Sequence, residues 1–137
     1  MTQAALLQEL PAPMNILMLE DEPLILMDLE FAAEDLGCRA MCASSVDEAM
    51  EILDHETVDC AILDVTLKDG ETCVPVAEAL AQRGIPYLLH SGDLDRHDET
   101  VRGLGAELVA KPASASRVIA RAVSFAQDKR DETAVPQ

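Results

Sequence analysis

Residues 61–70, AILDVTLKDG, join an apolar run to a carboxylate and then to a polar turn that contains a glycine. With the residues before it, the run becomes VDCAILD (58–64), which has the length and apolar content of a buried strand. That strand ends at Asp64. Either this aspartate is only the polar end of a strand, or the strand holds one carboxylate ready for chemistry.

Short apolar runs of this kind alternate with helical patterns along the chain. The expected strands are residues 15–19, 39–43, 58–64, 85–90 and 106–110. Apolar residues at helical spacing follow each strand, in residues 23–36, 46–53, 74–81, 93–103 and 114–127. Five repeats of strand and helix predict an α/β fold, in which helices cover both faces of a doubly wound, five-stranded parallel sheet.

The first and the last of the expected helices, residues 23–36 and 114–127, carry further predictions. Pro23 suits the first turn of a helix, and Gly37 suits its C-terminal cap. Between them, the core face is expected to be Ile25, Leu29, Ala32 and Leu36. On the helix that ends at residue 127, Arg117 and Arg121 lie one turn apart. They are either a solvated, ion-paired face or part of a docking or homodimer face.

The chain of 137 residues has about the length of a single domain. Residues 1–13 are expected to form a short leader closed by two prolines, and the polar residues 128–137 a flexible tail. Residues 14–127 then form the domain. Because so few residues follow the last helix, no second domain is expected after it.

Composition excludes several classes of function. The net charge is −16, which would repel nucleic acids and anionic membranes, and the chain has no Trp, one Tyr and two Phe. So few aromatic residues cannot form a stacking platform for bases. The four cysteines form no Cys-x-x-Cys pair, and no window reaches the roughly 18 apolar residues of a membrane helix. We therefore expect a cytoplasmic protein that binds neither nucleic acid nor membrane.

Polar side chains follow four of the expected strands. They are Glu20 and Asp21 after the first, Asp64 on the third, Ser91 after the fourth and Lys111 after the fifth. The carboxyl ends of parallel strands share one edge of the sheet, where α/β proteins bind their ligands. Each of these residues alone is more often a turn residue, a helix cap or a solvated charge. Their convergence on one edge favours a functional site.

The expected chemistry follows from the charges. Three crowded carboxylates repel one another, and Lys111 balances only one of them, so a divalent cation is expected. Mg²⁺ prefers oxygen ligands, which here would be Glu20, Asp21, Asp64 and the backbone carbonyl of Thr66. With Lys111 and the Ser91 hydroxyl on the phosphoryl oxygens, this set suits transfer of a phosphoryl group to Asp64 as nucleophile.

In this order and spacing, the motifs resemble the receiver domain of two-component response regulators, over about residues 14–127. The motifs are LEDEP (19–23), AILDVTL (61–67), HSG (90–92) and AKP (110–112). The resemblance implies a CheY-like, flavodoxin-like (βα)₅ fold and a Mg²⁺-dependent phosphorelay. In it, Asp64 takes a phosphoryl group from a sensor histidine kinase or a histidine phosphotransfer protein, and the domain signals by docking a downstream protein. The resemblance also implies a cis peptide between Lys111 and Pro112.

The chain departs from the family pattern at four positions. Glu20 stands where aspartate is usual, and Ser91 stands where threonine is commoner. Lys68 replaces a proline that is usual four residues after the phosphoacceptor, and Leu108 replaces the tyrosine or phenylalanine whose rotation reports phosphorylation. The sequence therefore does not predict how phosphorylation would be transmitted.

Two other functions are open. A small phosphatase with an aspartyl nucleophile would need a second acid two residues after Asp64, where Thr66 stands, so an enzyme is not expected. A pseudo-receiver would keep the fold as an interaction module that is not phosphorylated. The presence of Asp21, Asp64, Ser91 and Lys111 argues against it. His90 either lines the rim of the site or simply ends the fourth strand.

Overall fold

The structure is a computed structural model that describes residues 13–91, 104–111 and 113–133. The strands are β1 (Asn15–Leu19), β2 (Arg39–Ala43), β3 (Cys60–Asp64), β4 (Tyr87–Ser91) and β5 (Leu108–Ala110). The helices in these ranges are α2 (Pro23–Asp35), α3 (Val46–His55), α4 (Val74–Gln82), α6 (Ala115–Thr133) and the short 3₁₀ helix η1 (Lys68–Gly70). All neighbouring strands are parallel, in the order β2-β1-β3-β4-β5, which confirms the predicted doubly wound sheet.

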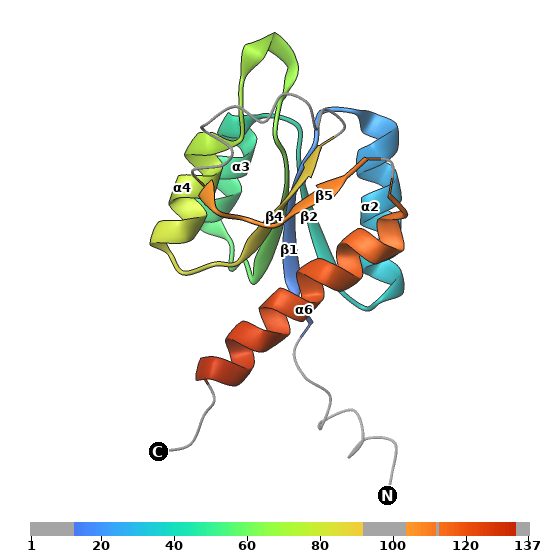
Figure 1. Cartoon of the computed structure of the whole chain (residues 1–137), viewed down its shortest axis with the longest axis vertical. Helices are drawn as coiled ribbons and strands as arrows, with labels where there is room; N and C mark the ends of the chain where they lie inside the picture. The colour runs from blue at the N-terminus through green and yellow to red at the C-terminus, as the bar shows by residue number, and fades with distance from the viewer. Residues whose placement is uncertain (1–12, 92–103, 112, 134–137) are drawn as a thin grey trace, which may run out of the picture.

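Helices cover both faces of this sheet, with α3 and α4 on one side and α2 and α6 on the other (Figure 1). Successive strand residues alternate between the two layers. On β1, Leu17 and Leu19 belong to the α3/α4 core, and Ile16 and Met18 belong to the α2/α6 core. β3 lies in the centre of the sheet and all five of its residues are buried. The strand that carries Asp64 is therefore held firmly on every side.

Local signals place the helices. The Ser45 hydroxyl accepts a hydrogen bond from the Glu48 amide at 3.2 Å, which caps the N-terminus of α3. The Glu48 carboxylate in turn accepts from the Ser44 amide at 3.0 Å. Gly37, with φ of 77°, takes the left-handed conformation that follows the end of α2. Gly37 thus marks where α2 leads into β2, and Ser45 marks where β2 leads into α3.

Two expectations about the helices are wrong. Leu36 lies outside α2 and is exposed, and Ala33 joins Leu29 and Ala32 on the buried face instead. The tail expected from residue 128 is helical as far as Thr133, because α6 continues without a break. Side chains support this extension: the Gln127 amide donates to Asp131 at 3.1 Å, and Arg130 lies 3.3 Å from the Asp59 carboxylate.

Some expectations fall outside the described residues. These are the leader up to residue 12, the helix expected at 93–103, the peptide bond to Pro112 and the last four residues of the tail. In the part of the chain that the structure does describe, no helix is both long enough and apolar enough to span a membrane.

Candidate functional site

The carboxyl ends of β1, β3 and β5 bring Glu20, Asp64 and Lys111 together. The main chain holds the loops that carry them: the Glu20 amide donates to the carbonyl of Ala43 at 3.0 Å, and the Lys111 amide donates to the carbonyl of Ser91 at 2.9 Å. By the alternation along each strand, Glu20, Asp64 and Lys111 all belong to the face that α2 and α6 cover. The site is thus built from the sheet itself.

Three carboxylates meet at this edge. Glu20, Asp21 and Asp64 each place one carboxylate oxygen within 4.8 Å of the others. Glu20 is only 1% exposed and Asp64 only 7% exposed, which is unusual for acidic residues. The Lys111 ammonium lies 2.7 Å from Glu20 Oε1 and 3.6 Å from Asp64 Oδ1. The structure therefore brings together four of the residues that the sequence selected.

Backbone amides hold two of these carboxylates. The Glu22 amide donates to Glu20 Oε2 at 3.2 Å, and the Lys68 amide donates to Asp21 Oδ2 at 2.6 Å. The second bond depends on a departure from the family pattern, because a proline at position 68 would have no amide hydrogen to donate. The loop after β3 is thereby tied to an acid that follows β1.

The charges at this site perturb one another. Burial, and then the charge of Glu20, raise the pKa of Asp64 to about 7, although the charge of Lys111 opposes the shift. Burial by itself would lower the pKa of Lys111, but the hydrogen bond to Glu20 and the charge of Asp64 outweigh it, and that pKa is raised. Lys111 therefore stays protonated, while Asp64 without a further cation holds its proton close to neutral pH.

The raised pKa predicts how stability depends on pH. The folded state binds the Asp64 proton more tightly than the unfolded state does. Protonated Asp64 therefore contributes its full share to the free energy of unfolding below about pH 4, and this share is lost as pH rises through about 7. We expect the free energy of unfolding of Asp64→Asn to equal that of wild type near pH 4. At pH 8 it should be larger than that of wild type by about 2–4 kcal/mol, since each pKa unit corresponds to 1.36 kcal/mol. Urea unfolding with a chelator present measures the difference. A difference that does not change with pH would contradict the shift.

The other predicted site residues have less complete support. Ser91 is the last residue of β4 and is buried, and it shares a main-chain hydrogen bond with Lys111. Thr66 is exposed and pairs with Thr72 in an isolated bridge two residues beyond Asp64. The role of its carbonyl in metal binding stays a prediction, as does the role of the Ser91 hydroxyl.

His90 was singled out by the sequence only as a residue at the rim or strand end. In the structure it is 4% exposed, and in the described part of the chain neither ring nitrogen has a hydrogen-bond partner. Burial, and then the charge of Lys111, lower the pKa of His90, so its ring is neutral. Its place two residues after Leu88 is the signal that could have marked it, because residues two apart on a strand share a face and Leu88 is fully buried.

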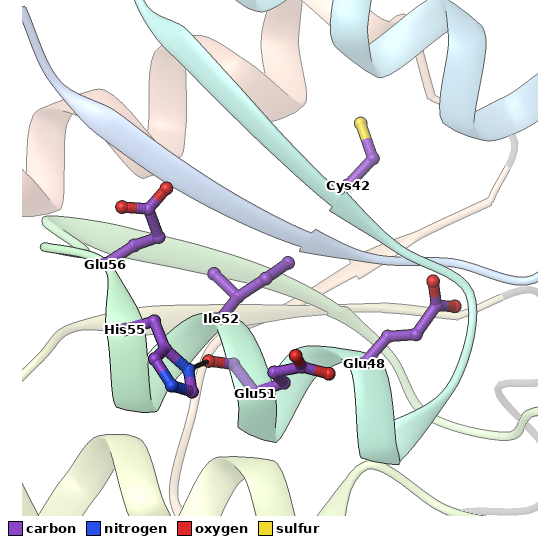
Figure 2. Close-up of a pocket in the computed structure, with 6 residues that line it drawn as sticks. All are labelled: Cys42, Glu48, Glu51, Ile52, His55 and Glu56. Carbon is purple, nitrogen blue, oxygen red and sulfur yellow. Dashed lines mark hydrogen bonds between the residues drawn. The ribbon is translucent and has the colours of Figure 1, made fainter.

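A hollow of about 390 Å³ lies at the β2 edge of the sheet. It is lined by Cys42, Glu48, Glu51, Ile52, His55 and Glu56 (Figure 2). His55 Nδ1 hydrogen-bonds to the carbonyl of Glu51 at 2.9 Å within α3. The Cys42 thiol points away from the His55 ring (Figure 2). These groups do not converge on one point, so this hollow is not a metal site.

The arginines of α6 answer part of another open question. Arg121 donates to both carboxylate oxygens of Glu107, at 2.7 and 2.6 Å, and its guanidinium lies 4.7 Å from the centre of the Phe125 ring. The ion-paired alternative is therefore confirmed for Arg121. A docking or homodimer role for this face stays a prediction.

The donor set suits Mg²⁺. Hard cations of this size take carboxylate oxygens, and the three acids supply them within reach of one ion. Burial, and then the charge of Glu20, raise the pKa of Asp64, and one lysine does not balance the three acids. A divalent ion at this place would relieve that imbalance.

A doubly wound sheet whose central strand ends in a buried aspartate, flanked by two acids and a lysine, defines a CheY-like receiver domain. Comparison with protein families agrees. The model of the response regulator receiver domain matches residues 16–123. The chain belongs to this family, which acts in two-component signalling.

Individual relatives place the chain more closely. It is 36% identical over 131 residues to the phyllosphere-induced regulator PhyR of Methylorubrum extorquens. The match covers 90% of this chain and 49% of that protein. The chain thus spans about half the length of this curated relative. SdrG of Sphingomonas melonis Fr1, solved in solution, shares 36% identity with a TM-score of 0.71, covering 86% of this chain and 99% of SdrG.

The receiver domain of PhyR from Erythrobacter litoralis has 28% identity and a TM-score of 0.66, covering 85% of this chain and 92% of that one. A CheY-like receiver from Methanospirillum hungatei has a TM-score of 0.76 at 20% identity, over 88% of this chain and 99% of that one. The second likeness shows the fold alone. Together they confirm the predicted flavodoxin-like architecture.

Proposed function

We propose that this domain accepts a phosphoryl group on Asp64 from the phosphohistidine of a sensor kinase or phosphotransfer protein, and signals by docking a downstream protein. One observation carries the proposal. Asp64 ends a fully buried central strand, with Glu20 and Asp21 within 4.8 Å and the Lys111 ammonium 3.6 Å away. Such a carboxylate is costly to maintain unless its charge is used.

In the proposed step, a carboxylate oxygen of Asp64 attacks the phosphorus of the phosphohistidine. A P–O bond forms, the P–N bond breaks, and the donor imidazole leaves with its electron pair and takes a proton from solvent. Lys111 neutralises charge on the transferred group, and the Ser91 hydroxyl donates a hydrogen bond to one of its oxygens. Mg²⁺ held by Glu20, Asp21, Asp64 and the Thr66 carbonyl would supply further charge neutralisation.

Uptake from a small donor tests this proposal. We expect the protein, incubated with acetyl phosphate and Mg²⁺, to gain the mass of one phosphoryl group. The rate should fall at least about 100-fold when a chelator removes the metal, because charge neutralisation supplies most of the catalysis in phosphoryl transfer. Intact-protein mass spectrometry measures both. If the folded protein gains no phosphoryl group with Mg²⁺ present, it is a pseudo-receiver instead.

The face where a phosphodonor would dock lies beside the site. Among the described residues, the exposed large apolar side chains are Leu24, Met27, Phe31 and Leu36. The first three are spaced along one side of α2, which begins directly after the acidic pair. Acidic residues and no basic ones accompany them on this helix. We propose that an apolar donor helix with basic flanks packs here while its histidine reaches Asp64.

Phe31→Ser tests the docking face. Phe31 is 55% exposed, so the fold should tolerate serine, while transfer from the cognate phosphorylated donor should slow about tenfold through weaker docking. Transfer from the donor protein is timed beside uptake from acetyl phosphate, which should not change. Leu36→Ser is the matched control, since Leu36 is 54% exposed at the far end of the helix. Equal effects of the two changes would rule out docking on the proposed face.

A further inference from the structure

A cavity adjoins the phosphoacceptor site on the side that α2 and α6 cover. Its volume is about 230 Å³. It is lined by Ile25, Asp28 and Leu29 of α2, His90 of β4, Lys111, Ala113 just before α6, and Ala115 at its first position. Most of the described lining residues are aliphatic, and Lys111 belongs both to this lining and to the carboxylate cluster.

The buried histidine in this wall lacks a hydrogen-bond partner in the part of the chain that the structure describes. His90 is 96% buried, and among the described residues nothing hydrogen-bonds to either ring nitrogen. A buried polar group without a partner costs free energy, and native proteins rarely leave one unsatisfied. Leucine at this position would avoid that cost, as Leu88 does two residues earlier on the same face of β4. The imidazole therefore points to a partner that comes from outside the fold.

Water is a poor candidate for that partner. The cavity has room for several water molecules, since one water occupies about 30 Å³ in the liquid. Each would need two to four polar contacts. Among the described lining residues, His90, Asp28 and Lys111 have polar side chains, and the alkyl groups of the other four offer no contact of this kind. The Lys111 ammonium is already engaged by Glu20 at 2.7 Å. An occupant with an apolar body and one polar group fits this wall better.

The charged residues at the rim of the cavity limit the chemical class of its occupant. Among the described lining residues, the charged side chains are one cation, Lys111, and one anion, Asp28, so these two together favour neither sign. Burying a charged group against aliphatic walls would cost more than one hydrogen bond to a neutral imidazole returns. The neutral ring offers one donor and one acceptor. Both nitrogens are buried as the ring stands, and a half-turn about the soft Cβ–Cγ torsion would bring one of them toward the cavity.

We propose that this cavity binds a small uncharged molecule about the size of phenol, whose O–H or N–H group hydrogen-bonds to His90. Its apolar body lies against Ile25, Leu29, Ala113 and Ala115. Because Lys111 belongs to both walls, occupancy alters the position of Lys111 at the carboxylate cluster and so the rate of phosphorylation. That last consequence rests on the proposed function; the binding itself does not.

Phenol and toluene are matched probes, since they have the same shape and only phenol has a hydroxyl. Each is titrated into the protein while the side-chain ¹⁵N resonances of His90 and the methyl resonances of Ala113 and Ala115 are followed by NMR. We expect saturable shifts with phenol in these groups. In His90→Leu, the ratio of phenol to toluene affinity should fall about tenfold, because the buried hydroxyl then has no partner. His90→Leu removes an unsatisfied group, so it should fold.

A second variant tests the place of binding. Ala115→Leu fills the cavity and should abolish the shifts with both probes, and Ala120→Leu, exposed on α6, should leave them unchanged. The proposal is overturned if phenol causes no saturable shift, if the affinity ratio is the same in His90→Leu, or if Ala115→Leu still binds. These readings need no phosphorylation, so a failure of binding is distinct from a failure of the proposed function. If binding holds, saturating phenol should change the rate of acetyl phosphate uptake; an unchanged rate overturns the link through Lys111.

Discussion

Asparagine in place of Asp64 is expected to abolish phosphoryl uptake. The amide has nearly the shape of the carboxylate, but its oxygen carries no negative charge and does not attack phosphorus. All other groups at the site remain, so binding of the donor is preserved while the nucleophile is lost. We expect the uptake rate with acetyl phosphate and Mg²⁺ to fall at least about 1000-fold, to the background of the intact-mass measurement.

Asp47→Asn is the control for this change. Asp47 is an exposed acid in the first turn of α3, so its loss alters the net charge by the same amount without touching the site. Uptake by this variant should equal that of wild type. If Asp64→Asn still gained one phosphoryl group, another residue would be the acceptor, and the strand end would need a different explanation.

Most of the fold could be predicted because each strand is short, apolar and bounded by turn residues. β1 and β2 have the predicted bounds, while β3, β4 and β5 begin two residues later than expected. Parallel topology then places all the strand ends on one edge, which is why Glu20, Asp21, Asp64 and Lys111 could be selected before any coordinates. Those residues are polar where apolar neighbours precede them, and that contrast is visible in a sequence.

Other features depend on tertiary contacts that a sequence does not display. Leu36 has the right spacing for the core, but α2 ends one residue before it and leaves it exposed. The hydrogen bond from the Lys68 amide to Asp21 requires two loops to meet, and the residue type at 68 reveals only that a donor exists. His90 looks like the end of a strand until the structure shows how deeply its ring is buried.

Methionine in place of Lys111 is expected to be the most destabilising of the single changes considered. The lysine lies 2.7 Å from Glu20, which is 1% exposed, and 3.6 Å from Asp64. Methionine keeps much of the length and apolar stem but leaves two buried carboxylates without their cation. Breaking a buried pair in this way typically costs about 3–5 kcal/mol. We expect a loss of that size in the free energy of unfolding by urea at pH 8 in chelator.

Two conditions should restore the stability of Lys111→Met, because both remove the unpaired charge. At pH 5 the deficit should shrink, since without Lys111 the pKa of Asp64 rises further above 7 and the carboxyl is protonated. At pH 8, Mg²⁺ should stabilise this variant more than wild type by replacing the missing positive charge. Lys129→Met, a change at an exposed lysine of α6, should show neither effect. A deficit in Lys111→Met that responded to neither pH nor Mg²⁺ would mean that lost packing, rather than unpaired charge, causes it, and the cluster would not need a cation to hold its acids.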